Sequence, residues 1–197
     1  MKLNRLASQL LTASAFVLPA AAIAQPAPAA PPSAATEGGT MNRADNHKLD
    51  SADKNFLENA AHGGATEVEG SRLAQEKATS PDVKAFASQM IQDHTKVNQE
   101  LAALAKQKGY EPPTEPALMQ KAKLKALSAT SGDTFDKMYA SQIGVDAHED
   151  TVKLFEKASN EAKDPDVKAF AQKTLPALRH HLEMARALHQ KVDGDKK

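Results

Sequence analysis

The sequence predicts an all-α protein, a four-helix bundle made of two duplicated helical hairpins. Three observations lead to this prediction. The heptapeptide PDVKAFA occurs twice, at 81–87 and at 165–171. Long stretches place apolar residues at alternating spacings of four and three, the pattern of a helix that buries one face. Beyond the N-terminal segment the chain has no Trp and no Cys, and it is rich in Ala, Lys, Glu, Leu and Gln, which favour helices.

Residues 1–24, MKLNRLASQLLTASAFVLPAAAIA, have the pattern of a secretory signal peptide. Lys2 and Arg5 precede an apolar run, and Ala22-Ile23-Ala24 forms a small-x-small cleavage site. The run is shorter than the roughly 20 residues of a membrane span, so we expect no stable span after cleavage, although a retained anchor stays open. The expected location is periplasmic or secreted.

The rest of the chain divides into three parts. Residues 25–50 are rich in Pro and Ala and predict a disordered tether. Residues 51–193 have the length of one domain, the helical bundle, and 194–197 form a short C-terminal tail. Without cysteines no disulfide supports the fold. Loss of residues 1–24 leaves 23 basic and 25 acidic residues, a balance that does not favour nucleic acid. A protein partner or a homodimer stays open.

Two of the predicted helices begin at the repeated segment. Ser80 and Asp164 are suited to cap a helix N-terminus, and each is followed by a proline at the first helical position. The first helix runs from 81 to Gly109 and the second from 165 to Gly194. Their apolar stripes contain one histidine each, His94 and His181.

Each of these helices is preceded by another long helical pattern, at 52–78 and at 134–160. The stripe of 52–78 includes Glu67, and that of 134–160 includes Met138, Val145 and His148. Each pair forms a hairpin, and two hairpins must pack together to cover their apolar faces. Between them, 110–131 contains a short amphipathic helix, ALMQKAKLKALSA, and returns the chain along the bundle. Such a crossover is typical of a ferritin-like four-helix bundle.

Four segments carry a family resemblance: FLENAAHGGATEVEGSRLA, FASQMIQDHTKVNQELAALAKQKG, FDKMYASQIGVDAHEDTVKLFEKA and DPDVKAFAQKTLPALRHHLEMA. Together they resemble the bacterial secreted domain of unknown function numbered forty-one forty-two, over about 53–190. The resemblance implies a ferritin-like helical bundle. It implies no established biochemical role.

One polar residue interrupts the apolar stripe of each long helix: Glu67, His94, His148 and His181. Counting at 1.5 Å per residue from the two interhelical turns places them at similar levels of the bundle. A carboxylate and three imidazoles suit one divalent transition metal, such as Zn, Cu, Fe or Mn. We therefore predict a metal site at these residues. As partners of the ligands, or alternates to them, we expect the neighbouring residues Asp93, Glu149 and His180.

The same four residues have a second interpretation, a buried hydrogen-bond network that fixes the helix register without a metal. The Glu-x-x-His motif of di-iron bundles is absent, because Ile91, Val145 and Leu178 stand three residues before the histidines. No nucleophile or phosphate-loop motif is present either, so we predict no catalytic residues and do not predict an enzyme.

Three functions remain open from the sequence. The first is a non-enzymatic binding or envelope-stress module of the periplasm. The second is a metal-binding or metal-dependent redox protein that uses the Glu/His cluster. The third is a carrier of apolar ligands that uses a kink at Pro176, because a proline inside a helix removes a backbone hydrogen bond.

Overall fold

The computed structural model describes residues 49–194. The predicted signal peptide, almost all of the predicted tether and the last three residues of the chain lie outside this range. The described helices are α1 (Ser51–Lys77), α2 (Pro81–Gln107), α3 (Leu118–Ser128), α4 (Gly132–Met138), the π-helix η1 (Tyr139–Asp146), α5 (Ala147–Glu161) and α6 (Pro165–Gly194). Residues 49–194 contain no strand, which confirms the all-α fold. None of these helices is both long and apolar enough to cross a membrane.

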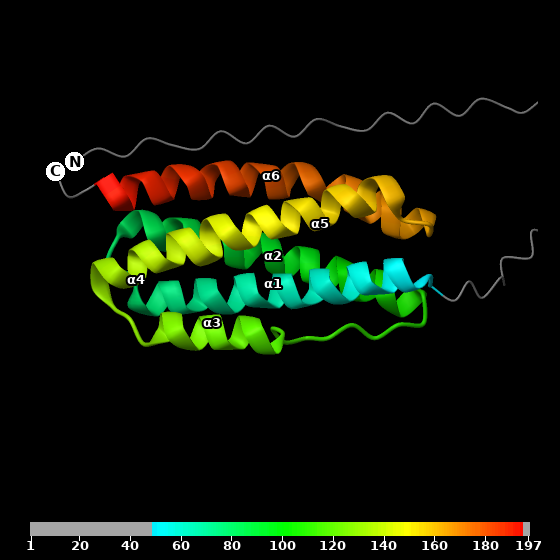
Figure 1. Ribbon diagram of the computed structural model, residues 1–197, viewed down its shortest axis with the longest axis horizontal. Coiled ribbons are helices and arrows are strands. Elements are labelled where there is room, and N and C mark those ends of the chain that lie inside the picture. Colours follow the sequence, from blue (N-terminus) through cyan, green and yellow to red (C-terminus); the bar gives the residue numbers. More distant parts are fainter. Residues whose placement is uncertain (1–48, 195–197) are drawn as a thin grey trace, which may run out of the picture. The chain divides into compact units, whose positions relative to one another are not determined.

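Two helical hairpins pack side by side to form the bundle (Figure 1). In the first hairpin α1 packs against α2. In the second, α4, η1 and α5 follow one another as one long rod that packs against α6. The crossover carries α3, which lies along α1 outside the four long rods (Figure 1). This is the predicted ferritin-like arrangement. The chain of α6 stays helical through Pro176.

The repeated segments begin α2 and α6 as the sequence predicts. The Ser80 hydroxyl oxygen accepts a hydrogen bond from the backbone N–H of Val83, at 3.4 Å. The Asp164 carboxylate accepts from the N–H groups of Asp166 and Val167, at 2.9 and 3.2 Å. These side chains satisfy helix N–H groups that have no partner within the helix, and so they fix where each helix starts.

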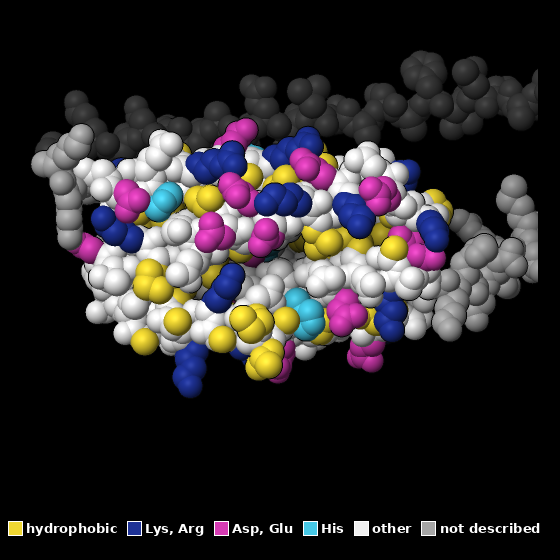
Figure 2. Space-filling view, in the orientation of Figure 1, with side chains coloured by type: hydrophobic (Ala, Val, Ile, Leu, Met, Phe, Trp, Pro, Cys, Tyr) yellow, Lys and Arg dark blue, Asp and Glu magenta, His cyan; other side chains and the backbone are white. Residues whose placement is uncertain are grey.

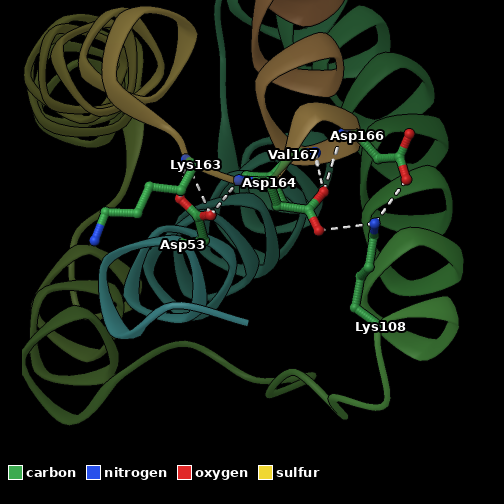
Figure 3. Close-up of polar contacts among 6 residues, drawn as sticks. All are labelled: Asp53, Lys108, Lys163, Asp164, Asp166 and Val167. Carbon is green, nitrogen blue, oxygen red and sulfur yellow. Dashed lines mark hydrogen bonds and ion pairs between the residues drawn. The ribbon is translucent and has the colours of Figure 1, made fainter. Parts of the chain in front are cut away.

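A buried aspartate near the start of α1 holds the turn of the opposite hairpin. Asp53 is 2 % exposed and accepts hydrogen bonds from the backbone N–H groups of Lys163, at 3.2 Å, and of Asp164, at 2.7 Å. Lys108, at the end of α2, pairs with Asp164 and Asp166 on the other side of the same turn, at 2.8 and 2.6 Å (Figure 3). The turn between α5 and α6 is therefore tied to both helices of the first hairpin.

The third long rod is not α-helical throughout, which corrects the prediction for 134–160. Residues 139–146 form a π-helix, a wider turn that accommodates one additional residue. Asp136 precedes Asp164 by 28 positions, whereas its counterpart Asp53 precedes Ser80 by 27. The inserted residue shifts the helical phase of the N-terminal part of this rod, so different residues face the core there. Tyr139 is fully buried, whereas the predicted core residue Met138 is only partly buried.

The apolar core consists of two clusters at different levels of the bundle. One is built around Phe56, Phe155 and Phe170, whose rings meet edge to face or tilted. The other is built around Phe86 and Tyr139. On the surface, Figure 2 shows charged side chains of both signs interspersed over α5 and α6, and hydrophobic side chains gathered over α3. Leu118 and Met119 of α3 are 82 % and 72 % exposed.

Candidate metal centre

A layer of polar side chains separates the two apolar clusters. It contains the residue that the sequence singles out on each long helix: Glu67 of α1, His94 of α2, His148 of α5 and His181 of α6. All four are at most 5 % exposed. Polar groups this deeply buried are costly unless they bond to one another or to a ligand, so their common level in the bundle requires an explanation.

The three histidines converge. One ring nitrogen from each of His94, His148 and His181 lies within 4.8 Å of the other two. The Nε2 atoms of His94 and His148 are 3.3 Å apart. Two nitrogens bound to one tetrahedral zinc at about 2.0–2.1 Å lie about 3.3–3.4 Å apart. This separation therefore suits two ligands of one ion, and it equally suits a hydrogen bond between the two rings.

The π-helix fixes the orientation of His148. This segment ends one residue before α5 begins, and its Ile143 carbonyl oxygen lies 3.2 Å from Nδ1 of His148. A carbonyl oxygen can only accept a hydrogen bond, so Nδ1 carries the proton and donates a hydrogen bond to the carbonyl. The lone pair of His148 is therefore on Nε2, the atom that faces His94. Such a hydrogen bond to the remote nitrogen is what usually orients a metal-binding histidine.

A carboxylate fixes His181 in the same way. Its Nε2 lies 3.0 Å from Oδ2 of Asp93, so Nε2 donates to the carboxylate. Asp93 is itself held by the side-chain amide of Gln89, at 2.7 Å. The lone pair of His181 is therefore on Nδ1, and this buried atom has no hydrogen-bond partner within the described part of the chain. An unpartnered buried lone pair beside two other imidazoles fits a metal ligand.

Glu67 lies behind His148 and outside the group of convergent nitrogens. Its Oε1 atom is 3.4 Å from Nδ1 of His148, but the two are not aligned for a hydrogen bond, and neither carboxylate oxygen has a hydrogen-bond partner among residues 49–194. Burial raises the pKa of Glu67 well above its usual value. Tyr139, whose hydroxyl bonds to Ser71 at 2.8 Å, belongs to the same buried region.

Burial also keeps the imidazoles neutral. It lowers the pKa of His94 well below its usual value, and the neighbouring His148 and His181 lower it further. Burial and His181 lower the pKa of His148 to about 4. Burial lowers the pKa of His181 as well, although Asp93 opposes this shift. Neutral imidazole is the form that binds metal, so the rings are ready to bind near neutral pH.

The other residues predicted around the site lie in different places. Asp93 contacts His181, as described above. Glu149 pairs with Arg186 at 2.8 Å and is not part of the convergent group. His180 is exposed on α6, beside the cluster and not within it.

Sequence reasoning missed the carbonyl of Ile143 and the π-helix that presents it. The signal for the insertion was the repeat itself: the two PDVKAFA segments are 84 positions apart, whereas Asp53 and Asp136 are 83 apart. One residue more in the third rod than in α1 predicts a local insertion between Asp136 and the repeat.

The fold and the sequence place this protein among known families. The family model for DUF4142, a domain of unknown function, matches residues 38–188. The chain belongs to the DUF4142 family. This is the family that the sequence resembles. No curated protein matches the chain.

Solved structures similar to this DUF4142 protein include two DUF305 proteins. A DUF305 fragment from Deinococcus radiodurans has a TM-score of 0.63 at 14% identity and covers 73% of this chain and 98% of its own. A putative secreted DUF305 protein from Streptomyces coelicolor has a TM-score of 0.60 at 14% identity, covering 73% and 94%. A conserved hypothetical protein from Mycobacterium tuberculosis has a TM-score of 0.55 at 16% identity, covering 71% and 91%. At these identities the likeness concerns the fold alone.

Proposed function

We propose that this DUF4142 protein binds a divalent transition metal ion through His94, His148 and His181 and works in the periplasm. One observation carries the proposal: three buried imidazoles bring ring nitrogens within 4.8 Å of one another. Imidazole nitrogen suits Zn, Cu, Fe and Ni, and choice among these depends on geometry and supply more than on intrinsic affinity.

Two details favour a metal site over a self-contained hydrogen-bond network. A network of this kind has to satisfy its own members, because a partly satisfied buried network is costly. Here Nδ1 of His181 has no hydrogen-bond partner within residues 49–194, although it lies in the layer of buried imidazoles. By contrast, the remote nitrogens of His148 and His181 are both held by acceptors, which is the arrangement that presents a lone pair to an ion.

The periplasmic location is supported by the signal-peptide pattern of residues 1–24 and agrees with the secreted neighbour in Streptomyces coelicolor. Binding, as part of a non-enzymatic module, is the extent of the proposed function. A ferritin-like di-iron oxidase is not proposed, because its Glu-x-x-His motif is absent from this chain.

Elemental analysis tests the proposal. The protein is purified from the periplasm without chelators, as the wild type and as the variants His94→Ala and His148→Ala. The control is His189→Ala, which removes a histidine that pairs with Asp193 outside the convergent group. We expect one metal ion per chain in the wild type and in the control, and none in the other two variants. Metal-free wild-type protein of full stability, also after incubation with Zn²⁺, Cu²⁺ or Fe²⁺, would overturn the proposal.

A further inference from the structure

We propose that the outward face of α3 docks reversibly on anionic lipid at the surface of a bacterial membrane. Phosphatidylglycerol, a common bacterial lipid, supplies the negative charge. This inference goes beyond the proposed function and does not depend on the metal centre. Three features of α3 carry it: an apolar strip on the side away from the bundle, lysines at both borders of this strip, and a contact area that suits a membrane better than a protein.

Only one face of α3 packs against the bundle. Its buried residues are Leu124 and Leu127, and the helix lies along α1, outside the four long rods (Figure 1). The opposite face carries an apolar strip of exposed residues: Leu118, Met119, Ala122 and Ala126. Since successive residues of an α-helix are about 100° apart, these four occupy about 100° of the circumference. The side of α3 that faces solvent is therefore apolar as well.

The strip includes the most conspicuous apolar side chains on the surface. Within residues 49–194, Leu118 and Met119 are the large apolar side chains that lie open to solvent, and they are adjacent. Figure 2 shows the hydrophobic side chains gathered over α3. Because apolar surface in water is unfavourable, a patch of this kind marks a site of contact with a partner or a membrane.

Lysines border the strip on both sides. On the helical wheel Lys121 and Lys125 lie at one border and Lys123 at the other, and all three are exposed. Lys121 pairs with Glu115, which precedes the helix. The helix itself contains no acidic residue, although the mature chain has slightly more acidic than basic residues. Lysine stems cover apolar surface while their ammonium groups reach a charged layer, which is typical of a helix that lies in a membrane interface.

The size and composition of this face argue against a protein as its occupant. Eleven residues form a helix about 16 Å long and about 10 Å wide. One face of such a helix covers a small part of the roughly 800 Å² that each partner contributes to a stable protein interface. The helix also lacks Trp, Tyr and Arg, which usually anchor such interfaces. A second copy of the chain is disfavoured because it would bring lysines against lysines. Fluid lipid adapts to the helix and requires no matching surface.

The test measures binding of the mature chain to sucrose-loaded vesicles by sedimentation. One set of vesicles contains equal parts of phosphatidylethanolamine and phosphatidylglycerol, and the neutral reference is phosphatidylcholine alone. Two double variants change the proposed surface: Leu118→Gln with Met119→Gln, and Lys123→Gln with Lys125→Gln. The matched control removes two exposed lysines of α5, as Lys153→Gln with Lys157→Gln. All these side chains are exposed, so the core stays intact.

A second readout reports insertion of the strip into lipid. The chain contains no Trp, so Met119→Trp introduces a single indole whose emission shifts to the blue when it enters an apolar environment. Ala177→Trp, at an exposed residue of α6, provides the same probe away from α3. We expect anionic vesicles to shift the emission of Met119→Trp and to leave that of Ala177→Trp unchanged.

We expect the wild type and the lysine control to bind the anionic vesicles weakly, with an association constant on the order of 10³–10⁴ M⁻¹, and not to bind the neutral ones. Both α3 double variants should bind about tenfold or more weakly. The proposal is overturned if the anionic vesicles bind none of these proteins, or bind the α3 variants as well as the wild type. It is also overturned if the wild type is a dimer that Leu118→Gln with Met119→Gln dissociates, because a second copy would then cover the face.

Discussion

Asp53 and Asp136 each hold the turn of the other's hairpin. Asp53 of the first hairpin accepts from the backbone N–H of Asp164 at 2.7 Å, and Asp136 of the second accepts from the N–H of Ser80 at 2.8 Å. Both aspartates are nearly fully buried. The duplication therefore preserved more than the helices: it kept a reciprocal clamp at both ends of the bundle, and this clamp fixes the relative levels of the four polar residues.

Replacement of Asp136 should loosen the bundle. Its carboxylate also accepts from the N–H and the hydroxyl of Thr79, so Asp136→Ala leaves two part-buried N–H groups without a partner. We expect a loss of about 2–4 kcal/mol in the free energy of unfolding, measured by urea denaturation. The control Asp150→Ala, at an exposed residue of α5, should cost less than about 0.5 kcal/mol. Equal effects of the two substitutions would mean that the clamp contributes nothing.

Deletion of Gln142 should weaken metal binding without unfolding the bundle. The deletion removes the additional residue of the π-helix and restores the spacing found in α1, so the bundle should still form. The Ile143 carbonyl is then drawn into an ordinary helical hydrogen bond and no longer orients His148. We expect a folded protein whose metal affinity falls by about 10–100-fold, measured by competition with a chelating dye.

A matched deletion provides the contrast. Removal of Ala65 from α1, which has no π-helix, rotates all residues on one side of the deletion by about 100° relative to the core, and we expect it to unfold the protein. If deletion of Gln142 is as disruptive as deletion of Ala65, the π-helix is needed for folding and not for the site.

Replacement of Glu67 by glutamine should raise the stability of the metal-free protein at pH 7. The pKa of the Glu67 carboxyl is higher in the folded than in the unfolded protein. Its contribution to the free energy of unfolding is therefore fully present below its pKa in the unfolded protein, and it is lost as pH rises through its pKa in the folded protein. Glu67→Gln removes this loss, so its advantage over the wild type should vanish in acid. The control is Glu69→Gln, at an exposed residue of the same helix, which should leave stability unchanged at every pH.

The same variant tells a positioning residue from a ligand. Because Glu67 lies 3.4 Å from Nδ1 of His148 without a hydrogen bond to it, metal binding in Glu67→Gln should remain measurable and should weaken less than about tenfold. Complete loss of metal, as in His94→Ala, would show that the carboxylate binds the ion itself.

The buried histidines should make the metal-free protein sensitive to mild acid. Burial lowers the pKa of His148 in the folded protein to about 4, from about 6.5 in the unfolded protein. Its contribution to the free energy of unfolding is therefore fully present above pH 6.5 and is lost as pH falls toward 4. The loss is on the order of 3 kcal/mol for this group alone. His94, whose pKa is also lowered, adds to this loss of stability in acid. Two groups oppose the loss: Asp93 favours the charged form of His181, and Glu67 gains a proton in the folded protein.

Urea denaturation between pH 7.5 and 4.5 measures this effect, and the Glu67→Gln background removes the opposing carboxyl. In that background His148→Gln should show a shallower decline below pH 6.5 than its parent. Parallel curves would mean that His148 is not buried as a neutral ring in solution.

The bundle was predictable because its signals are local and repeated. Capping residues before a proline, a stripe of apolar residues and a polar crossover each act over one or two helical turns, and they all agree. The stripes also identified Glu67, His94, His148 and His181, because a polar residue in an apolar stripe is conspicuous.

The details of the site were not predictable in the same way. Which nitrogen of His148 carries the proton depends on the carbonyl of Ile143, and that carbonyl is exposed to the ring because of the π-helix. A helical wheel drawn with one uniform period places Met138 in the core and misses Tyr139, because a single inserted residue changes the phase. Likewise, the positions of Asp93 and Glu67 relative to the rings depend on side-chain geometry across three helices.

The measurement that tests the central claim most directly is a crystal structure of the metal-loaded protein with anomalous diffraction recorded at the absorption edge of the bound metal. We predict one anomalous peak per chain, inside the bundle, about 2.0–2.1 Å from one ring nitrogen each of His94, His148 and His181. A peak confined to the surface, for example between His189 and Asp193, with the three buried rings unchanged, would contradict the account.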